Sequence, residues 1–239
     1  MTLRRSPVRT RYSVGGIELA HVSEIRDLGV MIDTKLTFAP HVTDIVSRAN
    51  RALGLLMRSF QVGTRAAKFN RSAIMAAYCA NVRSIMEYGC VVWAGAASSH
   101  VARVDRVQHK FLTWLLSRTS SGHADSLSYS GLLSHFKIPS LAARRVQHDL
   151  LFLRNVVRGK VDCMALLRAF SLHVPPRSTR ASPLFSVPPA RVRTVDCGVF
   201  CRATRAMNSF SRGTESDVDL FSDSAGVFRA QVLKYVLTI

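Results

Sequence analysis

Acidic residues are scarce in this sequence, with 15 Asp and Glu among 239 residues. Metal-dependent nucleotidyl transfer needs carboxylates that hold metal ions about 4 Å apart. The best local pair is Asp27 and Asp33, in an alternating segment that predicts one β-strand over residues 26–33. Six strand residues at about 3.3 Å each put these carboxylates roughly 20 Å apart. The sequence therefore offers no local pair for a two-metal site, and only acids brought together by the fold remain open.

Cysteine is also sparse and irregularly spaced, with five residues and no signal peptide before them. This pattern predicts reduced thiols in an intracellular protein, with the nucleus as one candidate location because the first residues are rich in Arg and Ser. Cys197 and Cys201, even with His173, match no common zinc spacing. The HExxH, Walker A, GxGxxG and GxSxG motifs are absent. We therefore expect no metal site, no cofactor and no small-molecule substrate.

No apolar run approaches 18 residues, so we expect no transmembrane helix. Hydrophobic residues make up 48% of the chain, which is enough for a buried core in one or two domains.

Arginine is the residue in excess. The chain has 33 Lys and Arg, of which only six are Lys, and a formal net charge of +18. The planar guanidinium binds phosphate in two-point fashion and stacks on bases. Nucleic acid is therefore the first partner to consider and an anionic membrane the second.

Helical periodicity dominates residues 41–60, a segment from about 65 to 93, and residues 101–116 and 141–158. In the first, third and fourth of these helices, cations lie opposite the apolar stripe. Inward packing of the stripes would push the cations outward, where they would form one binding surface or, alternatively, separate solvated faces. The predicted nucleic-acid-binding residues are Arg48, Arg51, Arg58, Arg103, Arg106, Lys110 and Arg144.

The two ends of the chain give weaker signals. Gly15-Gly16 between short apolar segments predicts a β-hairpin. After residue 160 we expect a short helix over 162–170, an irregular Pro-rich section, a short strand over 191–195 and a last helix over 225–237. The predicted fold class is mainly α: a helical bundle, a small N-terminal antiparallel β-hairpin and an irregular Pro-rich C-terminal section.

Two aromatic residues, Tyr88 and Trp93, lie in an apolar run near the break between the second and third helices. Exposed aromatic rings can stack nucleic-acid bases. The surrounding Cys90, Val91 and Val92 instead favour burial of both rings in the core.

Six segments taken in order resemble one family, the reverse transcriptases of non-LTR (LINE-type) retrotransposons, in the part downstream of the polymerase palm. The similarity covers about residues 10–170. Where members of that family often have Pro after the Trp, this chain has Ala94-Gly95. The segments are IRDLGVMID (25–33), LTFAPHV (36–42), RANRALGLLMR (48–58), VRSIMEYGCVVWAG (82–95), VDRVQHKFLTWLL (104–116) and IPSLAARRVQHDLLFLRNVVRGKVD (138–162).

The resemblance implies that the first strands are the end of the palm and that the helices form the thumb, which grips the template–primer duplex. The family's catalytic box, an aromatic residue followed by Ala-Asp-Asp, is absent from this sequence, so no catalytic residue can be assigned. The implied regions are a disordered basic start (1–10), a β-hairpin remnant of the palm (11–40), a thumb-like helical region (41–120), a helical extension (121–174) and a Pro-rich irregular section with a terminal helix (175–239).

We therefore expect a fragment of an RNA-directed DNA polymerase that cannot polymerise alone and binds RNA or an RNA–DNA hybrid without sequence preference. One alternative is a structural or interaction protein that has no nucleic-acid role and whose basic charge is merely inherited. Another is an active enzyme with unfamiliar chemistry.

Overall fold

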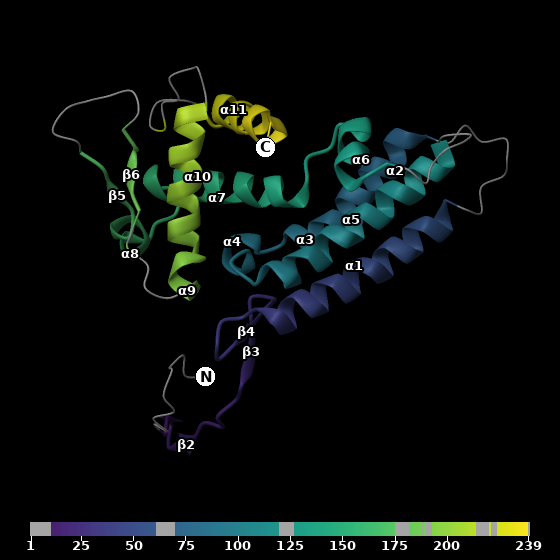
Figure 1. Cartoon of the computed structure of the whole chain (residues 1–239). Helices are drawn as coiled ribbons and strands as arrows, with labels where there is room; N and C mark the ends of the chain where they lie inside the picture. The colour runs from purple at the N-terminus through teal and green to yellow at the C-terminus, as the bar shows by residue number, and fades with distance from the viewer. Residues whose placement is uncertain are drawn as a thin grey trace.

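The protein is mainly helical, with small two-stranded antiparallel sheets, as the periodicity predicts. The structure is a computed structural model and describes residues 11–60, 70–119, 127–174, 182–187, 189, 193–213, 220 and 224–238. Figure 1 shows two groups of helices, which we call the first and second lobes, and β-hairpins that extend from the first lobe at the N-terminal end. The predicted helix break at Gly63-Thr64 and the basic start over 1–10 lie outside the described residues.

The first lobe contains the predicted helices over 41–60 and 101–116, and the segment predicted as helical from about 65 to 93 is divided here into four shorter elements within the described residues. Its core is built from the apolar stripes of these helices, including Val42, Leu53, Tyr78, Phe111 and Leu115. The Tyr78 and Phe111 rings stack almost in parallel, with centroids 3.9 Å apart. The elements are α1 (Ala39–Ser59), α2 (Arg71–Tyr78), the π-helical turn η1 (Cys79–Arg83), α3 (Ser84–Glu87), α4 (Cys90–Trp93), α5 (Ser98–Thr119) and α6 (Tyr129–Phe136).

The second lobe has its own core, which includes Leu150, Phe185, Phe210 and Phe228. One of its helices, α10, was not predicted from the sequence. The predicted strand over 191–195 is wrong, because Arg193–Asp196 forms a helical turn. The elements are α7 (Leu141–Val157), α8 (Met164–Arg168), β5 (Ser171–Leu172), β6 (Phe185–Ser186), α9 (Arg193–Asp196), α10 (Val199–Gly213) and α11 (Ala225–Thr238).

Helix α7 joins the lobes and packs against α3, α4 and α5 on one side and against α10 and α11 on the other (Figure 1). Its ends obey local rules. The Ser140 side chain accepts a hydrogen bond from Ala143 N, and Gly159 comes after the last turn with φ 65°. Because α7 is covered on two sides, its polar residues Gln147 and Arg154 are buried.

The N-terminal segment forms two hairpins. The first pairs β1 (Ser13–Val14) with β2 (Ile17–Glu18) around Gly15-Gly16, as predicted. The second pairs β3 (Glu24–Asp27) with β4 (Val30–Asp33). The prediction of one continuous strand over 26–33 is therefore wrong. The chain reverses at Leu28-Gly29, where both residues have positive φ, so Asp27 and Asp33 lie on opposite strands.

Asp33 has a structural role. Its carboxylate accepts hydrogen bonds from the backbone N–H groups of Thr37 and Phe38, at 3.1 and 2.8 Å, and from the Thr37 hydroxyl at 3.0 Å. Burial raises the pKa of this carboxyl group, and the hydrogen bonds more than offset that effect to leave it lowered. Asp33 thus fixes the turn that leads from β4 into α1.

Trp93 is fully buried, as predicted, and its Nε1 donates to Tyr88 O at 2.9 Å. The prediction for Tyr88 is wrong, since 57% of the residue is exposed. Its hydroxyl donates to Leu28 O at 2.7 Å, which holds the ring over the turn of the second hairpin. The backbone bends at Gly89, with φ 59°, and so sends these two neighbouring rings in different directions.

Candidate nucleic-acid interface

Helices α1 and α5 run side by side in the same direction along one face of the first lobe (Figure 1). Near the start of both helices, Arg103 Nη1 donates to Thr43 Oγ1 at 3.0 Å. This contact shows which sides of the two helices face each other at the surface. Arg51 lies eight residues after Thr43 and Lys110 seven after Arg103, which is about 10–12 Å along each helix. Arg51 and Lys110 therefore lie at nearly the same distance along the helix axes from the Thr43–Arg103 contact.

Helical geometry also gives the direction of the other cations. At about 100° per residue, Arg51 and Arg58 lie within roughly 80° of Thr43 around α1. Arg106 and Lys110 lie within about 60° of Arg103 around α5. We call these residues the seam cations: Arg51, Arg58, Arg103, Arg106 and Lys110.

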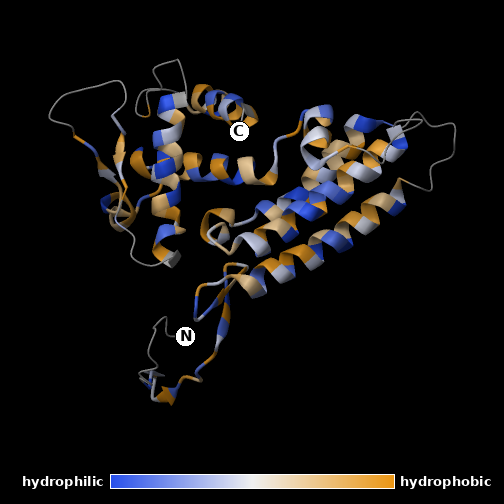
Figure 2. Cartoon of the chain, viewed as in Figure 1, coloured by the Kyte–Doolittle hydropathy of each residue, from blue (hydrophilic) through white to orange (hydrophobic). Residues whose placement is uncertain are grey.

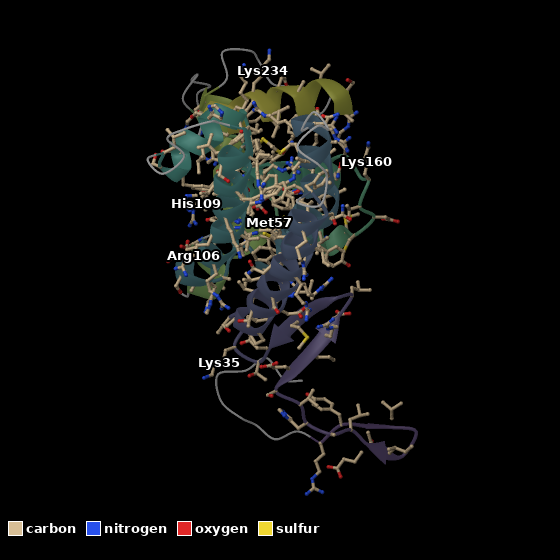
Figure 3. All side chains as sticks on the ribbon, turned by 90° about the vertical axis from the view of Figure 1, so that its right-hand side faces the viewer. Lys35, Met57, Arg106, His109, Lys160 and Lys234 are labelled. Atoms are coloured by element: carbon tan, nitrogen blue, oxygen red, sulfur yellow. The ribbon has the colours of Figure 1, made fainter. Side chains whose placement is uncertain are left out.

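The seam cations are available to a polyanion to different degrees. Arg51, Arg58, Arg106 and Lys110 are exposed, and none of the four forms an ion pair with any residue that the structure describes. Arg103 is half-buried through its bond to Thr43. In Figure 2 the front of α5 is hydrophilic, and Figure 3 shows Arg106 and His109 projecting from the same edge of the molecule.

Arg48 lies elsewhere. It is five residues from Thr43, or about 140° around α1, and therefore on the side away from α5. Its Nη1 is 3.5 Å from Asp44 Oδ2, and the same oxygen lies 3.3 Å from Arg26 Nη2. Arg51 is only three residues, or about 60°, from Arg48 around α1. What distinguishes Arg48 is its contact with Asp44 beside Arg26, which the sequence pattern did not single out.

Arg144 does not point outward, and that prediction is wrong. Its Nε and Nη2 donate to the two carboxylate oxygens of Glu87 at 2.7 and 2.6 Å, and Nη1 donates to Gln147 Oε1 at 2.7 Å. Only 19% of the Arg144 side chain is exposed. The reason is the position of α7, whose polar residues face the first lobe instead of solvent.

Glu87 is correspondingly held in its charged form. Burial raises the pKa of its carboxyl group, but the hydrogen bonds of Arg144 and the neighbouring His148 and Arg83 outweigh that effect and lower the pKa to about 2. Arg202 of α10 also links the lobes, because it donates to Val91 O in the first lobe while both oxygens of Asp149 in α7 accept from it. These charges hold the two lobes together.

The described residues give no indication of a metal centre. Among them, no group of three or more His, Cys, Asp or Glu side chains is arranged to hold an ion. All five cysteines lie in the described ranges and none is in a disulfide. No helix in the described ranges has a stretch long and apolar enough to cross a membrane.

The sequence has a partial similarity to a protein described as "Probable RNA-directed DNA polymerase from transposon X-element" of Drosophila melanogaster. The two are 31% identical over 83 residues, which is 35% of this chain and 9% of the length of that protein. No family model matches the sequence. No solved structure matches it. The comparison supports a distant, partial relation to a retrotransposon reverse transcriptase.

Proposed function

We propose that this chain is a non-catalytic piece of a non-LTR retrotransposon reverse transcriptase that binds RNA or an RNA–DNA hybrid through the seam cations. The observation that carries the proposal is the arrangement of α1 and α5. In this proposal α1 and α5, which come from distant parts of the sequence, present the five seam cations on one face. A duplex presents its phosphates in a comparable linear order.

The physical basis is electrostatic. Each phosphate that an Arg or Lys neutralises releases condensed counterions, so binding weakens steeply with salt and shows little sequence preference. Arg51, Arg58, Arg106 and Lys110 meet that requirement because they are exposed and have no ion-pair partner among the described residues. Arg103 supports the same line from a half-buried position.

The division of the chain belongs to the same proposal. In it, residues 11–40 are the end of the palm and 41–120 are the thumb-like region, with the helical extension (121–174) and the C-terminal section (175–239) after them. The two hydrophobic cores support a division within the extension, since Leu141 belongs to the first core and Ala143 to the second. Helix α7 is then the element through which the thumb-like region contacts the second lobe.

The test is a salt titration of hybrid-duplex binding. The proteins are the wild type, Arg51→Ala, Arg106→Ala and the double variant, with Arg212→Ala on α10 as a control. Arg212 is equally exposed but lies in the second lobe. We expect each seam substitution to reduce the slope of log K against log salt by about 0.9 per lost phosphate contact, and the control to leave it unchanged.

The alternative, a structural or interaction protein without a nucleic-acid role, gives a different result in the same experiment. It predicts either no binding of duplex or binding with the same salt slope in all five proteins. Either result would overturn the proposal.

A further inference from the structure

A pocket of about 370 Å³ opens between α1, α3 and the turn of the β3–β4 hairpin. This volume falls within the range of about 300–1,000 Å³ that is typical of small-molecule sites. The residues that matter for its chemistry are Arg26, Leu28, His41, Arg48, Ile85 and Tyr88.

The rim of the pocket is cationic and already ordered. Arg26 and Arg48 both contact the same Asp44 oxygen, at 3.3 and 3.5 Å, so one carboxylate holds two guanidinium groups together. Each guanidinium has five N–H donors, and most of them remain available. Two positive charges against one negative charge leave a net charge of +1 at the rim. This arrangement favours an anion with several acceptor oxygens, such as a phosphate group.

The inner wall contains an unused hydrogen-bond donor. His41 is buried, and its Nδ1 accepts from Met31 N at 3.3 Å. In the neutral ring the proton is therefore on Nε2. Burial lowers the pKa of His41, and nearby Arg26 and Arg48 lower it further against the effect of Asp44, so the ring stays neutral. His41 Nε2 has no hydrogen-bond partner within the described part of the chain and is fully buried, so the ring forms an uncharged inner wall.

The outer wall is aromatic. The Tyr88 hydroxyl donates to Leu28 O, and its ring lies against Gly29, where an added Cβ would come within 3.2 Å of Tyr88 Cε1. Gly29 has φ 86°, so the turn both needs glycine and leaves room for the ring. With Leu28 and Ile85, the ring forms an apolar surface on which a base can stack.

We propose that this pocket binds a nucleoside monophosphate, either as a free nucleotide or as the 5′-phosphorylated end of a single strand. The phosphate binds Arg26 and Arg48, and the base packs on Tyr88. The proposal does not depend on the seam cations, because none of them lines the pocket.

The experiment is calorimetric titration of the full chain with AMP, adenosine and inorganic phosphate as separate probes. We expect AMP to bind at least about tenfold more tightly than adenosine or inorganic phosphate, because the arginines of the rim bind the phosphate and the aromatic wall binds the base. Arg26→Gln with Arg48→Gln should weaken AMP binding by about tenfold or more. Tyr88→Leu should also weaken it, whereas Tyr88→Phe keeps the ring and should bind nearly as well as the wild type.

The seam variant Arg51→Ala with Arg106→Ala is the matched control and should bind AMP normally, so failure of one proposal is distinguishable from failure of the other. A 5′-phosphorylated oligothymidylate and its unphosphorylated form separate the two ligand sources. Tighter binding of the phosphorylated strand than of AMP identifies a strand end, and equal or weaker binding identifies a free nucleotide. Absence of AMP binding at millimolar concentration, or binding that the Arg26/Arg48 and Tyr88→Leu substitutions leave unchanged, would overturn the proposal.

Discussion

Arg144 and Glu87 form a two-point ion pair across the boundary between the lobes, with N–O distances of 2.7 and 2.6 Å. The two residues are 57 positions apart and belong to α7 and α3. Sequence periodicity placed Arg144 among the nucleic-acid-binding residues. The structure instead makes it a link between the lobes, and this difference has measurable consequences.

Removal of either partner should destabilise the protein without changing nucleic-acid binding. Glu87→Gln leaves a partly buried guanidinium without its counter-charge, and we expect a loss of about 2–4 kcal/mol in the free energy of unfolding, measured with urea. Glu18→Gln is the control, since Glu18 forms only an exposed ion pair with Arg11. Arg144→Ala should lose similar stability but keep the wild-type salt slope for duplex binding. A reduced salt slope would instead show that Arg144 contacts nucleic acid.

The same pair predicts a pH dependence. The folded-state pKa of Glu87 is about 2, below its ordinary value of 4.5. Its contribution to stability is therefore complete above about pH 4.5 and is lost as the pH falls toward 2. The difference in unfolding free energy between wild type and Glu87→Gln should shrink over that interval. A constant difference would show that Glu87 is not held in its charged form.

His41 should produce a second pH effect at higher pH. Burial lowers its folded-state pKa below 6.5, the surrounding charges being Asp44, Arg26 and Arg48. The unfolded chain then takes up a proton before the folded chain does, so wild-type stability should fall as the pH drops below about 6.5. In His41→Asn, Oδ1 can replace Nδ1 as acceptor, and this part of the decrease should disappear. Parallel pH profiles for the two proteins would contradict the assignment of a neutral, buried ring.

Trp93 should act as a core residue and have no role as a base-stacking residue. It is fully buried and hydrogen-bonded to Tyr88 O, so Trp93→Ala should cost about 3–5 kcal/mol in unfolding free energy. Val92→Ala is the control at the adjacent, exposed position. A Trp93→Ala protein with normal stability and weakened RNA binding would reverse this assignment.

Gly95 should be required for contact between the lobes. A Cβ at this position would overlap the Cys197 carbonyl oxygen in the second lobe, so Gly95→Ala should destabilise by about 1–3 kcal/mol. Gly54 in α1 provides the opposite case, because a Cβ there meets no atom within 4 Å. Gly54→Ala should stabilise the helix by about 0.5–1 kcal/mol. If Gly95→Ala and Gly54→Ala changed the free energy of urea unfolding equally, the contact between Gly95 and Cys197 would not limit how closely the lobes pack.

The chain alone should not extend a primer. The sequence contains no aromatic-Ala-Asp-Asp box, and two-metal transfer depends on such carboxylates. The measurement is primer extension by the purified protein with dNTPs and Mg²⁺ or Mn²⁺, next to a buffer control. Extension above that control would show that other acids assemble a catalytic site.

The sequence by itself determined the elements whose signals are local. The 3.6-residue period predicted α1, α5, α7 and α11, and Gly15-Gly16 predicted the first hairpin. Local rules also account for the ends of α7, which the structure places at Ser140 and Gly159. These signals act over a few residues, through backbone conformation, capping and the side of a helix that is apolar. The same period placed seven cations opposite apolar stripes, and the structure shows that one of them, Arg144, is instead paired with Glu87.

The tertiary structure alone decided where the polar faces point and which side chains meet. The Leu28-Gly29 reversal is held by Tyr88, 60 residues away. Arg144 faces inward because a second lobe covers α7, and Arg48 meets Arg26 at the pocket because the β3–β4 hairpin folds against α1. Helical period identifies a polar face but not the segment that packs against it. That depends on contacts between segments far apart in the chain, which local signals do not encode.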